Sequence, residues 1–505
     1  MVSQLEQGIS AALLTVREWM NTLAPINRFP PEILCLISTH LSSHQDRFRA
    51  SSVCGYWRRT FLQRGALWSE LFLENGEDYM TTLFERAKGS ALDITVNGLV
   101  PLGTITLLSP YAQKIRRLSF PDNRWTNILK FLRVVCGPLP LLHTLEIYIT
   151  DLGNQLNQLN LLTFPPSPLF CGAINLEEFV LDLRWGGSLN HFVFPTLTTL
   201  KLLTPQMDEF DASDLFDFLR ASPMLRTVEV VNRGGFISGS IPHDMVVVLP
   251  NVENFFLSAE DDTRDAYELA VHISCPRAKY TSLVNENGMT PGVEVFPDSA
   301  SWVAISRQYT TSPVEEVTLQ IDHHKPEVLI ACSLTFRSSD ATVIELGSQV
   351  TYEEEPLMCC GKIFSQACRT IRGHPLLSHV KRLHLKDGTT SFGVGIVVPM
   401  VDVVRELFRS LVPLDELTIH GFDLRIFLAS FIDLPDFRHL ERVFPPVKVL
   451  TISETLMFNK RGCEDGIAEL TKSQRKLGKP FERVMVHGRE ADEVEVLRSM
   501  RGIWP

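Results

Sequence analysis

Five residues with metal-binding side chains lie close together near residue 370 and are the first candidates for chemistry. They are Cys359, Cys360, Cys368, His374 and His379. Thiolate and imidazole groups are ligands of zinc, but this spacing matches no regular zinc finger or ribbon. The apolar residues among them recur at helical spacing, and buried free cysteine is a common feature of such a helix. The sequence therefore predicts no metal site and no cofactor.

The motifs of catalytic and nucleotide-binding sites are incomplete. Gly393-Val394-Gly395 lacks the third glycine of a dinucleotide-binding turn. The sequence contains neither a Gly-x-x-x-x-Gly-Lys-Ser/Thr phosphate loop nor a Gly-x-Ser-x-Gly nucleophile elbow. The acidic clusters at 260–262 and 353–355 are typical of solvated loops. We therefore expect a protein that is not an enzyme and has no catalytic residues.

A short pattern of apolar residues recurs from about residue 90 onward and predicts the strands of this part of the chain. The pattern is an apolar residue, two variable residues, a second apolar residue, one variable residue and a third apolar residue. Regular copies are roughly 21 to 34 residues apart, which overlaps the range of leucine-rich repeats. The copies begin at Ile115, Leu142, Leu176, Leu197, Leu225, Val252, Val314, Val380, Leu414, Val447 and Phe481.

Helix-like stretches lie between the copies, for example at 127–135, 212–221 and 400–411. A repeated strand, turn and helix cannot bury its apolar face alone, so we expect the copies to stack into a solenoid. The match is irregular, because the usual turn asparagine is mostly absent and residues 259–313 and 322–379 contain fewer copies. The predicted fold class is α/β, with an irregular leucine-rich-repeat-like solenoid over residues 90–505, its parallel strands inside and its helices outside.

An amphipathic helix is predicted at the N-terminus, within residues 1–26. Leu5, Ile9, Leu13, Val16 and Met20 recur at steps of three and four residues, and a proline at position 25 then stops the helix. Packing of this helix against its own protein is the simpler interpretation. Binding to a partner is the alternative.

Residues 27–73 predict three short helices. Pro30 suits the first turn of a helix, and Glu32 lies near the positive end of its dipole. Asp46 is a candidate N-cap for a second helix that would extend through Val53, and Trp57 lies in the third. Three short helices make a marginal core, so we expect several large apolar side chains to stay exposed, which usually marks a partner surface.

The anchor residues of this segment occur in a specific order. They are Phe29-Pro30-Pro31-Glu32-Ile33-Leu34, Ile37, Leu41, Val53-Cys54, Trp57-Arg58 and Leu67-Trp68. In this order they resemble the F-box motif, which opens with Leu-Pro-x-Glu, continues with Ile-Phe and Leu, and ends with Val-Cys-x-x-Trp-Arg and Leu-Trp. Two positions differ, since Phe29 replaces the usual leucine and Ser38 replaces the phenylalanine after Ile37.

The resemblance implies which residues bind a partner. In the F-box family these helices dock on the Skp-type adaptor of a cullin-RING ubiquitin ligase. Pro30 and Glu32 would set the first helix, while Trp57 would serve equally well as an internal packing residue. An F-box followed by a leucine-rich-repeat-like region also resembles the large F-box family of mushroom-forming fungi. The implied adaptor-binding residues are Phe29, Pro30, Glu32, Ile33, Ile37, Leu41, Val53, Trp57 and Leu67.

The charge distribution favours a protein partner over a nucleic acid. The chain carries 48 Lys and Arg against 59 Asp and Glu, a net charge of -11, so it has no global basic field for nucleic acid. Residues 28–73 nevertheless contain six arginines and three acidic residues. A basic module on an acidic chain suggests an acidic partner, and the Skp adaptors of the family are acidic.

The compartment is predicted from what the sequence lacks. The ten cysteines form no C-x-x-C pair, the N-terminus has no basic patch followed by an apolar run, and no apolar stretch approaches the roughly 20 residues that cross a bilayer. We expect a reduced cytoplasmic or nuclear protein without contact to a membrane.

The resemblance implies a substrate-receptor subunit of a Skp-cullin-F-box E3 ubiquitin ligase, with the solenoid binding a client protein. Two alternatives stay open at this point. One is an F-box scaffold that binds the adaptor without causing degradation, and the other is an unrecognised ligand-binding solenoid.

Overall fold

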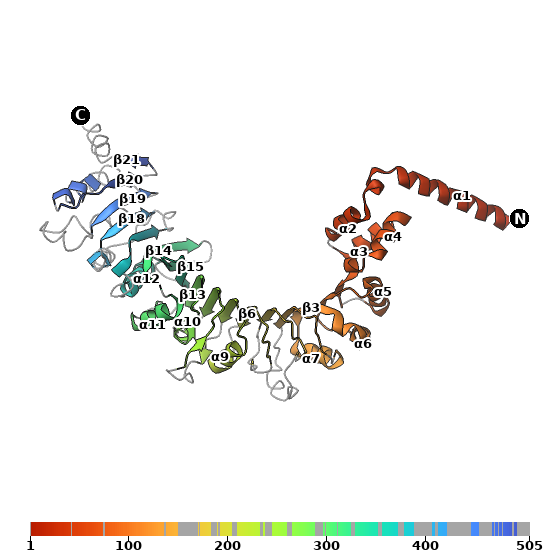
Figure 1. Ribbon diagram of the computed structural model, residues 1–505, viewed down its shortest axis with the longest axis horizontal. Helices are drawn as coiled ribbons and strands as arrows, with labels where there is room; N and C mark the ends of the chain where they lie inside the picture. Colours follow the sequence, from red (N-terminus) through yellow and green to blue (C-terminus); the bar gives the residue numbers. More distant parts are fainter. Residues whose placement is uncertain are drawn as a thin grey trace. The chain divides into compact units, whose positions relative to one another are not determined.

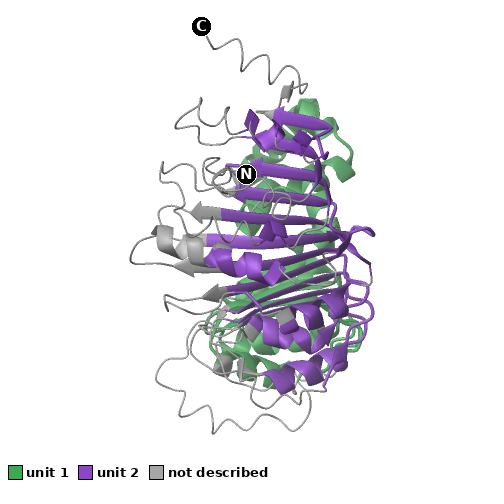
Figure 2. Ribbon diagram, turned by 90° about the vertical axis from the view of Figure 1, so that its left-hand side faces the viewer, with its two compact units in different colours: residues 1–184, 191–197 green, residues 185–190, 198–505 purple. Residues whose placement is uncertain are grey.

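The computed structural model divides the chain into two compact units (Figure 2). Unit 1 comprises residues 1–184 and 191–197, and unit 2 comprises residues 185–190 and 198–505. The residues that the structure describes are 2–41, 43–73, 76–135, 138–149, 170, 172–182, 189, 192–204, 210–232, 236–237, 245–259, 265–287, 296–297, 299–310, 312–324, 329–351, 356–371, 378–387, 407–409, 413–421, 446–453, 467–468, 470–472, 474–476, 478–486 and 489–491.

Helices make up the N-terminal part of unit 1 (Figure 1). Residues 27–73 form what we call the helical module, which comprises the end of η1, the helices α2, α3, α4 and η2, and the strand that follows them. Its core contains Leu34, Phe61 and Trp68, each fully buried. Helix α1 lies outside this core. The helices are α1 Val2–Leu23, η1 Pro25–Arg28, α2 Pro31–Thr39, α3 His44–Ser51, α4 Gly55–Gln63 and η2 Gly65–Trp68.

Five strands in the described part of unit 1 form a parallel sheet in the order β1-β2-β3-β4-β5. Buried and half-buried residues alternate along β2 and β4, so one face of each strand is apolar. Helices pack on that face, as where Phe131 of α7 meets Phe120 of β3 edge to face at 5.3 Å between ring centroids. The elements are β1 Glu70–Phe72, α5 Glu77–Ala87, β2 Leu92–Asn97, α6 Leu102–Leu108, η3 Ser109–Lys114, β3 Ile115–Asn123, α7 Trp125–Val134, β4 Thr144–Ile149 and β5 Glu178–Asp182.

Unit 2 begins with four more parallel strands in the order β6-β8-β11-β13. Two-stranded ribbons, β7 with β9 and β10 with β12, lie apart from this sheet. The elements are β6 Thr199–Thr204, β7 Phe210–Asp211, α9 Ala212–Arg220, β8 Thr227–Asn232, β9 Phe236–Ile237, β10 Val247–Val248, β11 Asn254–Ala259, α10 Asp265–Val271, β12 Ile273–Ser274, β13 Tyr280–Asn287 and α11 Ser299–Tyr309.

An antiparallel meander then interrupts the parallel order. It consists of β14 Val314–His324, β15 Leu329–Ser338 and β16 Val343–Thr351. Strand β16, the last of the three, pairs with β13, whereas β14 pairs with the next repeat strand. The order in the sheet is therefore β13-β16-β15-β14-β17. The remaining elements are α12 Pro356–Ile371, β17 Arg382–Asp387, β18 Leu414–His420, β19 Val447–Ser453, β20 Arg483–Val486 and β21 Arg489–Ala491.

The fold is mixed α/β, with N-terminal helices and a mostly parallel sheet, which confirms the predicted fold class at that level. Helices α7 and α9 occupy the helix-like stretches at 127–135 and 212–221. In the third stretch, 400–411, only residues 407–409 are described, and they are helical. The stretches with fewer copies of the pattern contain β13, β15 and β16, whereas β14 carries the copy that begins at Val314. The pattern did not reveal that β14, β15 and β16 form an antiparallel meander.

One glycine fixes the contact between the helical module and α5. A Cβ atom at Gly65, the first residue of η2, would lie 2.2 Å from the carbonyl oxygen of Ala87 at the end of α5. That oxygen belongs to the backbone, so it cannot rotate away, and only glycine permits this approach.

We expect Gly65→Ala to destabilise the helical module by roughly 1–3 kcal/mol, because a methyl group there forces the two backbones apart. Faster hydrogen exchange in residues 55–73 and 77–87 would show the effect. The control is Gly76→Ala, since a Cβ at Gly76 meets no atom within 4 Å. Equal exchange in the two variants would contradict the prediction.

Candidate functional site

The first helix of the helical module presents one face to the core and one to solvent. Pro30 occupies the N-cap of α2, and Glu32 lies in its first turn, where its charge suits the helix dipole. Leu34 and Ser38 are fully buried on the inner face. The Ser38 hydroxyl donates a 2.7 Å hydrogen bond to the Cys35 carbonyl, so this polar side chain is satisfied where the F-box motif has a phenylalanine.

The second helix begins and ends earlier than the sequence predicted. Ser43, not Asp46, is the N-cap of α3, and its hydroxyl oxygen accepts the Asp46 backbone N–H at 3.1 Å. The expectation that Asp46 caps the helix is wrong because the helix begins at His44, so Asp46 lies within its first turn, where its carboxylate accepts a 2.7 Å hydrogen bond from the Ser43 hydroxyl. The helix ends at Ser51, so Val53 lies beyond it, in the connection to α4. The Ser51 hydroxyl donates to the Phe48 carbonyl at 2.7 Å and so occupies an acceptor of the last turn.

The third helix holds the module together through its aromatic side chains. Trp57 of α4 is 8% exposed, and its indole N–H donates a 2.6 Å hydrogen bond to the side-chain oxygen of Asn27. The Trp68 indole donates to the Phe61 carbonyl at 2.9 Å. Both rings therefore satisfy their only polar group inside the protein. Trp57 is an internal packing residue in this structure.

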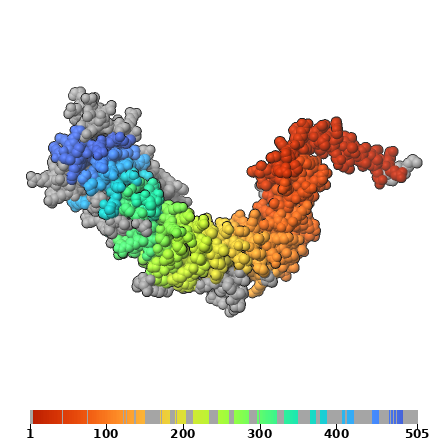
Figure 3. All heavy atoms as spheres, in the orientation of Figure 1, coloured from red at the N-terminus to blue at the C-terminus, as the bar shows by residue number. Residues whose placement is uncertain are grey.

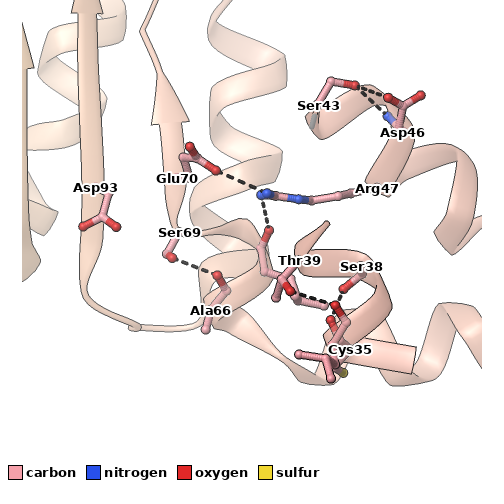
Figure 4. A network of polar contacts seen from close by, with 12 residues as sticks. Cys35, Ser38, Thr39, Ser43, Asp46, Arg47, Ala66, Ser69, Glu70 and Asp93 are labelled. Carbon is pink, nitrogen blue, oxygen red and sulfur yellow. Dashed lines mark hydrogen bonds and ion pairs between the residues drawn. The ribbon is translucent and has the colours of Figure 1, made fainter. Parts of the chain in front are cut away.

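Arg47 joins α3 to the strand that follows the helices (Figure 4). Its guanidinium donates to the Leu67 carbonyl at 3.0 Å and to the Glu70 carboxylate at 3.2 Å. Arg86 of α5 makes a second connection, since it lies over the rings of Phe48 and Trp68, 4.3 and 4.7 Å from their centroids. A cation between two aromatic faces is attracted to both. The helices of the module therefore contact both β1, the first strand of the sheet, and α5, the helix that follows that strand.

The predicted adaptor-binding residues divide by exposure. Phe29, Ile33 and Val53 are 45%, 40% and 60% exposed, and Pro30 and Glu32 are exposed as well. The structure half-buries two others, Ile37 and Leu41, and buries Trp57 and Leu67.

One exposed apolar residue was missing from the sequence-based set. Leu36 is 57% exposed and lies three residues after Ile33, so helical periodicity alone could have placed both on one face of α2. We call the large apolar side chains of the helical module that are at least 40% exposed the docking patch: Phe29 before α2, Ile33 and Leu36 on α2, and Val53 after α3.

The charges of the helical module are mainly positive. Arg28, Arg58 and Arg59 are exposed, and none of them forms an ion pair in the described part of the chain. The other arginines of the module do, as in Arg64 with Glu32 at 3.6 Å and Arg49 with Asp46 at 3.1 Å. The uncompensated charge of the module therefore comes from three exposed cations.

The candidate metal ligands of the sequence do not assemble in the described residues. Among those residues no group of three or more His, Cys, Asp or Glu is arranged to hold a metal ion. Cys368 is buried in α12, and burial raises the pKa of its thiol, whereas His379 is exposed. The side chains of Cys359 and Cys360, and all of His374, lie outside the described residues. No helix in the described parts is both long and apolar enough to cross a membrane.

His44 gives the module a dependence on pH. It is the first residue of α3, is 8% exposed, and lies edge-on to Phe72 with the ring centroids 6.0 Å apart. Burial, and after it the charge of Arg47, lowers the pKa of His44 from its ordinary value of 6.5. The folded module therefore holds this imidazole neutral at a pH where the unfolded chain already binds a proton.

Since the unfolded state binds more protons below pH 6.5, the contribution of His44 is full above that pH and is lost as the pH falls below it. At pH 5.5 we expect a loss of up to ~1.4 kcal/mol, which His44→Phe abolishes. Urea-dependent hydrogen exchange of residues 44–68, corrected for intrinsic rates at each pH, measures this. The exposed His40→Gln is the control and should keep the wild-type slope. An unchanged slope in His44→Phe would contradict the assignment.

Comparison with known proteins adds one finding for this region. No curated protein matches the chain. The F-box-like family matches residues 26–74, the segment that contains α2, α3, α4, η2 and the docking patch. The helical module is thus an F-box-like domain.

Proposed function

We propose that this chain is the substrate-receptor subunit of a Skp-cullin-F-box ubiquitin ligase. The observation that carries the proposal is the docking patch on an F-box-like domain. Phe29, Ile33, Leu36 and Val53 remain 40–60% exposed although the interior of the domain is closely packed. Exposed apolar groups gathered on one small domain indicate a surface that a partner covers.

The chemistry of the patch fits an acidic partner with apolar pockets. Burying apolar surface contributes about 25 cal/mol per Å², so four large side chains supply a core of several kcal/mol for an interface. Arg28, Arg58 and Arg59 would steer and orient a partner of negative charge. The Skp-type adaptors of the F-box family have this character.

We propose further that the strands and helices of the two units are irregular leucine-rich repeats of one solenoid, whose sheet binds the client protein. The solvent-facing side chains of the sheet support this role. In unit 2, neighbouring strands place the half-buried Lys201, Glu229 and Phe256 side by side, and the row continues past the buried Ser282 to the half-buried Glu345. Such a row offers ionic and apolar groups to a protein ligand.

The mechanism is positional, and no bond is made or broken by the chain itself. The F-box-like domain attaches to the adaptor, and the sheet holds a client near the catalytic subunits of the ligase. Ubiquitin transfer gains from the high effective concentration of client lysines. Such ligases act in the cytoplasm and the nucleus, where we expect this chain.

The docking patch can be tested by a pair of charge substitutions. We expect Ile33→Asp with Val53→Asp to weaken binding of a Skp-type adaptor at least a hundredfold, because each change places a carboxylate against an apolar pocket and adds negative charge. Co-expression and size-exclusion chromatography measure the complex, and calorimetry gives its Kd.

The matched control is Leu102→Asp, since Leu102 is 66% exposed but lies at the start of α6, outside the F-box-like domain. This variant should bind the adaptor as the wild type does. Adaptor binding that survives the double substitution would refute the proposal. A complex that contains the adaptor but never a cullin would instead indicate an F-box protein that causes no degradation.

A further inference from the structure

Helix α1 is uncovered by other described residues along most of its length (Figure 3), and it carries a large apolar surface. Residues 4–20 are all exposed, and among the described helices and strands only the short η1 that follows α1 packs extensively against it. Large apolar side chains on it are half or more exposed: Leu5 68%, Ile9 54%, Leu13 52%, Leu14 59%, Val16 52%, Trp19 63%, Met20 61% and Leu23 50%.

Seven of these eight side chains lie on one side of the helix. At 100° per residue, all of them except Leu14 fall within an arc of about 120°. Within the arc a regular seam alternates steps of four and three residues, which is the spacing of a two-stranded coiled coil. The seam consists of Leu5, Ile9, Ala12, Val16, Trp19 and Leu23.

We expect α1 to be only marginally stable as a helix without a partner. Gly8 lies in its interior, where glycine costs about 1 kcal/mol relative to alanine, and a Cβ there would meet no atom within 4 Å. An isolated helix of this length is marginal in water, since most helical stability in proteins comes from packing of the apolar face. Covering the seam would therefore stabilise α1 as well as remove its apolar surface from water.

The charges beside the seam indicate which partner covers it. Glu6 and Arg17 are three turns apart and lie on the same edge of the apolar arc. When two copies of the helix pack antiparallel, equal edges face each other, so Glu6 of each copy approaches Arg17 of the other. In the register that places Leu5 opposite Val16 and Ile9 opposite Ala12, both of these ion pairs are within reach of the long arginine side chain.

Other occupants fit the helix less well. Helices that lie on membranes carry lysines and arginines on the polar face, but α1 has a single arginine and two glutamates, Glu6 and Glu18. The same residues give α1 a net charge of −1, which offers no attraction to an acidic adaptor. In a parallel pair, the edge with Glu6 and Arg17 would face the edge with Gly8, Thr15 and Thr22 of the other copy. Neither charged residue would then have an ionic contact.

We propose that α1 is a dimerisation helix, which pairs antiparallel with α1 of a second copy of this chain through the Leu5–Leu23 seam and two Glu6–Arg17 ion pairs. The pairing would bring two F-box-like domains into one particle. It does not depend on the proposed ligase role, because α1 lies outside the docking patch.

The seam is tested on the full chain by light scattering after size-exclusion chromatography over a range of concentrations. We expect a dimer for the wild type and a monomer for Ile9→Glu with Val16→Glu, a shift of at least tenfold in Kd. Leu14→Glu is the matched control, since Leu14 is as exposed as the seam residues but lies on the opposite side of the helix. It should remain dimeric. A wild type that is monomeric throughout would overturn the proposal, as would a dimer that survives the double substitution.

The antiparallel direction is tested by charge reversal. Glu6→Arg gives a copy with two positive charges on that edge, and Arg17→Glu gives a copy with two negative charges. We expect each variant alone to dimerise about tenfold more weakly, whereas a mixture of the two should form mixed dimers with the wild-type affinity. If the two variants carry tags of different mass, the fraction of mixed dimers can be measured. Dimers that are indifferent to these changes would overturn the antiparallel pairing.

Two further measurements separate other partners from a second copy. Flotation with neutral and anionic vesicles, and calorimetry with a Skp-type adaptor, are made on the wild type and on Ile9→Glu with Val16→Glu. We expect no vesicle binding and an unchanged adaptor affinity. Vesicle or adaptor binding that disappears with the double substitution would assign the seam to that partner and overturn the proposal.

Discussion

The pairing of β1 with β2 is the contact on which the arrangement of unit 1 depends. Strand β1 is the last part of the F-box-like domain and also the first strand of the sheet. Its flanking residues continue the ladder, since the Asp93 N–H donates to the Ser69 carbonyl and the Leu73 N–H to the Thr95 carbonyl, each at 2.9 Å. Because Arg47 holds Glu70 on the same strand, the domain joins the sheet through backbone and side chain together, with no linker between them.

The parts of the fold that follow from local pattern could be predicted from the sequence. An apolar residue every second position predicts a buried strand face, and the central residues of the pattern, such as Leu118, Leu145 and Leu450, are fully buried. The meander could not be predicted this way, because strand order is set by contacts between distant segments. The sequence around β15 alternates like any repeat strand, and nothing local in it specifies an antiparallel neighbour.

In the candidate site, too, the sequence predicts the features that depend on local pattern but not those that depend on tertiary contacts. The F-box motif and its prolines located α2 and α4, since caps and helical periodicity are local signals. Which anchors face solvent depends on tertiary packing, so Trp57 and Leu67 turn inward while Leu36, outside the motif anchors, turns outward. The choice of Ser43 over Asp46 as the cap of α3 was likewise undetermined, because either residue type can cap a helix.

The meander also has a consequence for how unit 2 assembles during synthesis. Along β6, β8, β11 and β13, each strand pairs with a segment that emerges 26–28 residues later, as in Thr199 with Thr227 and Asn254 with Tyr280. Strand β13 must then wait for β16, since Tyr280 pairs with Val343. Until then β13 is a free parallel edge, which is prone to wrong pairing. The emerging chain therefore exposes an unpaired parallel edge for longer here than along β6, β8 and β11, and a chaperone that covers this edge would prevent wrong pairing.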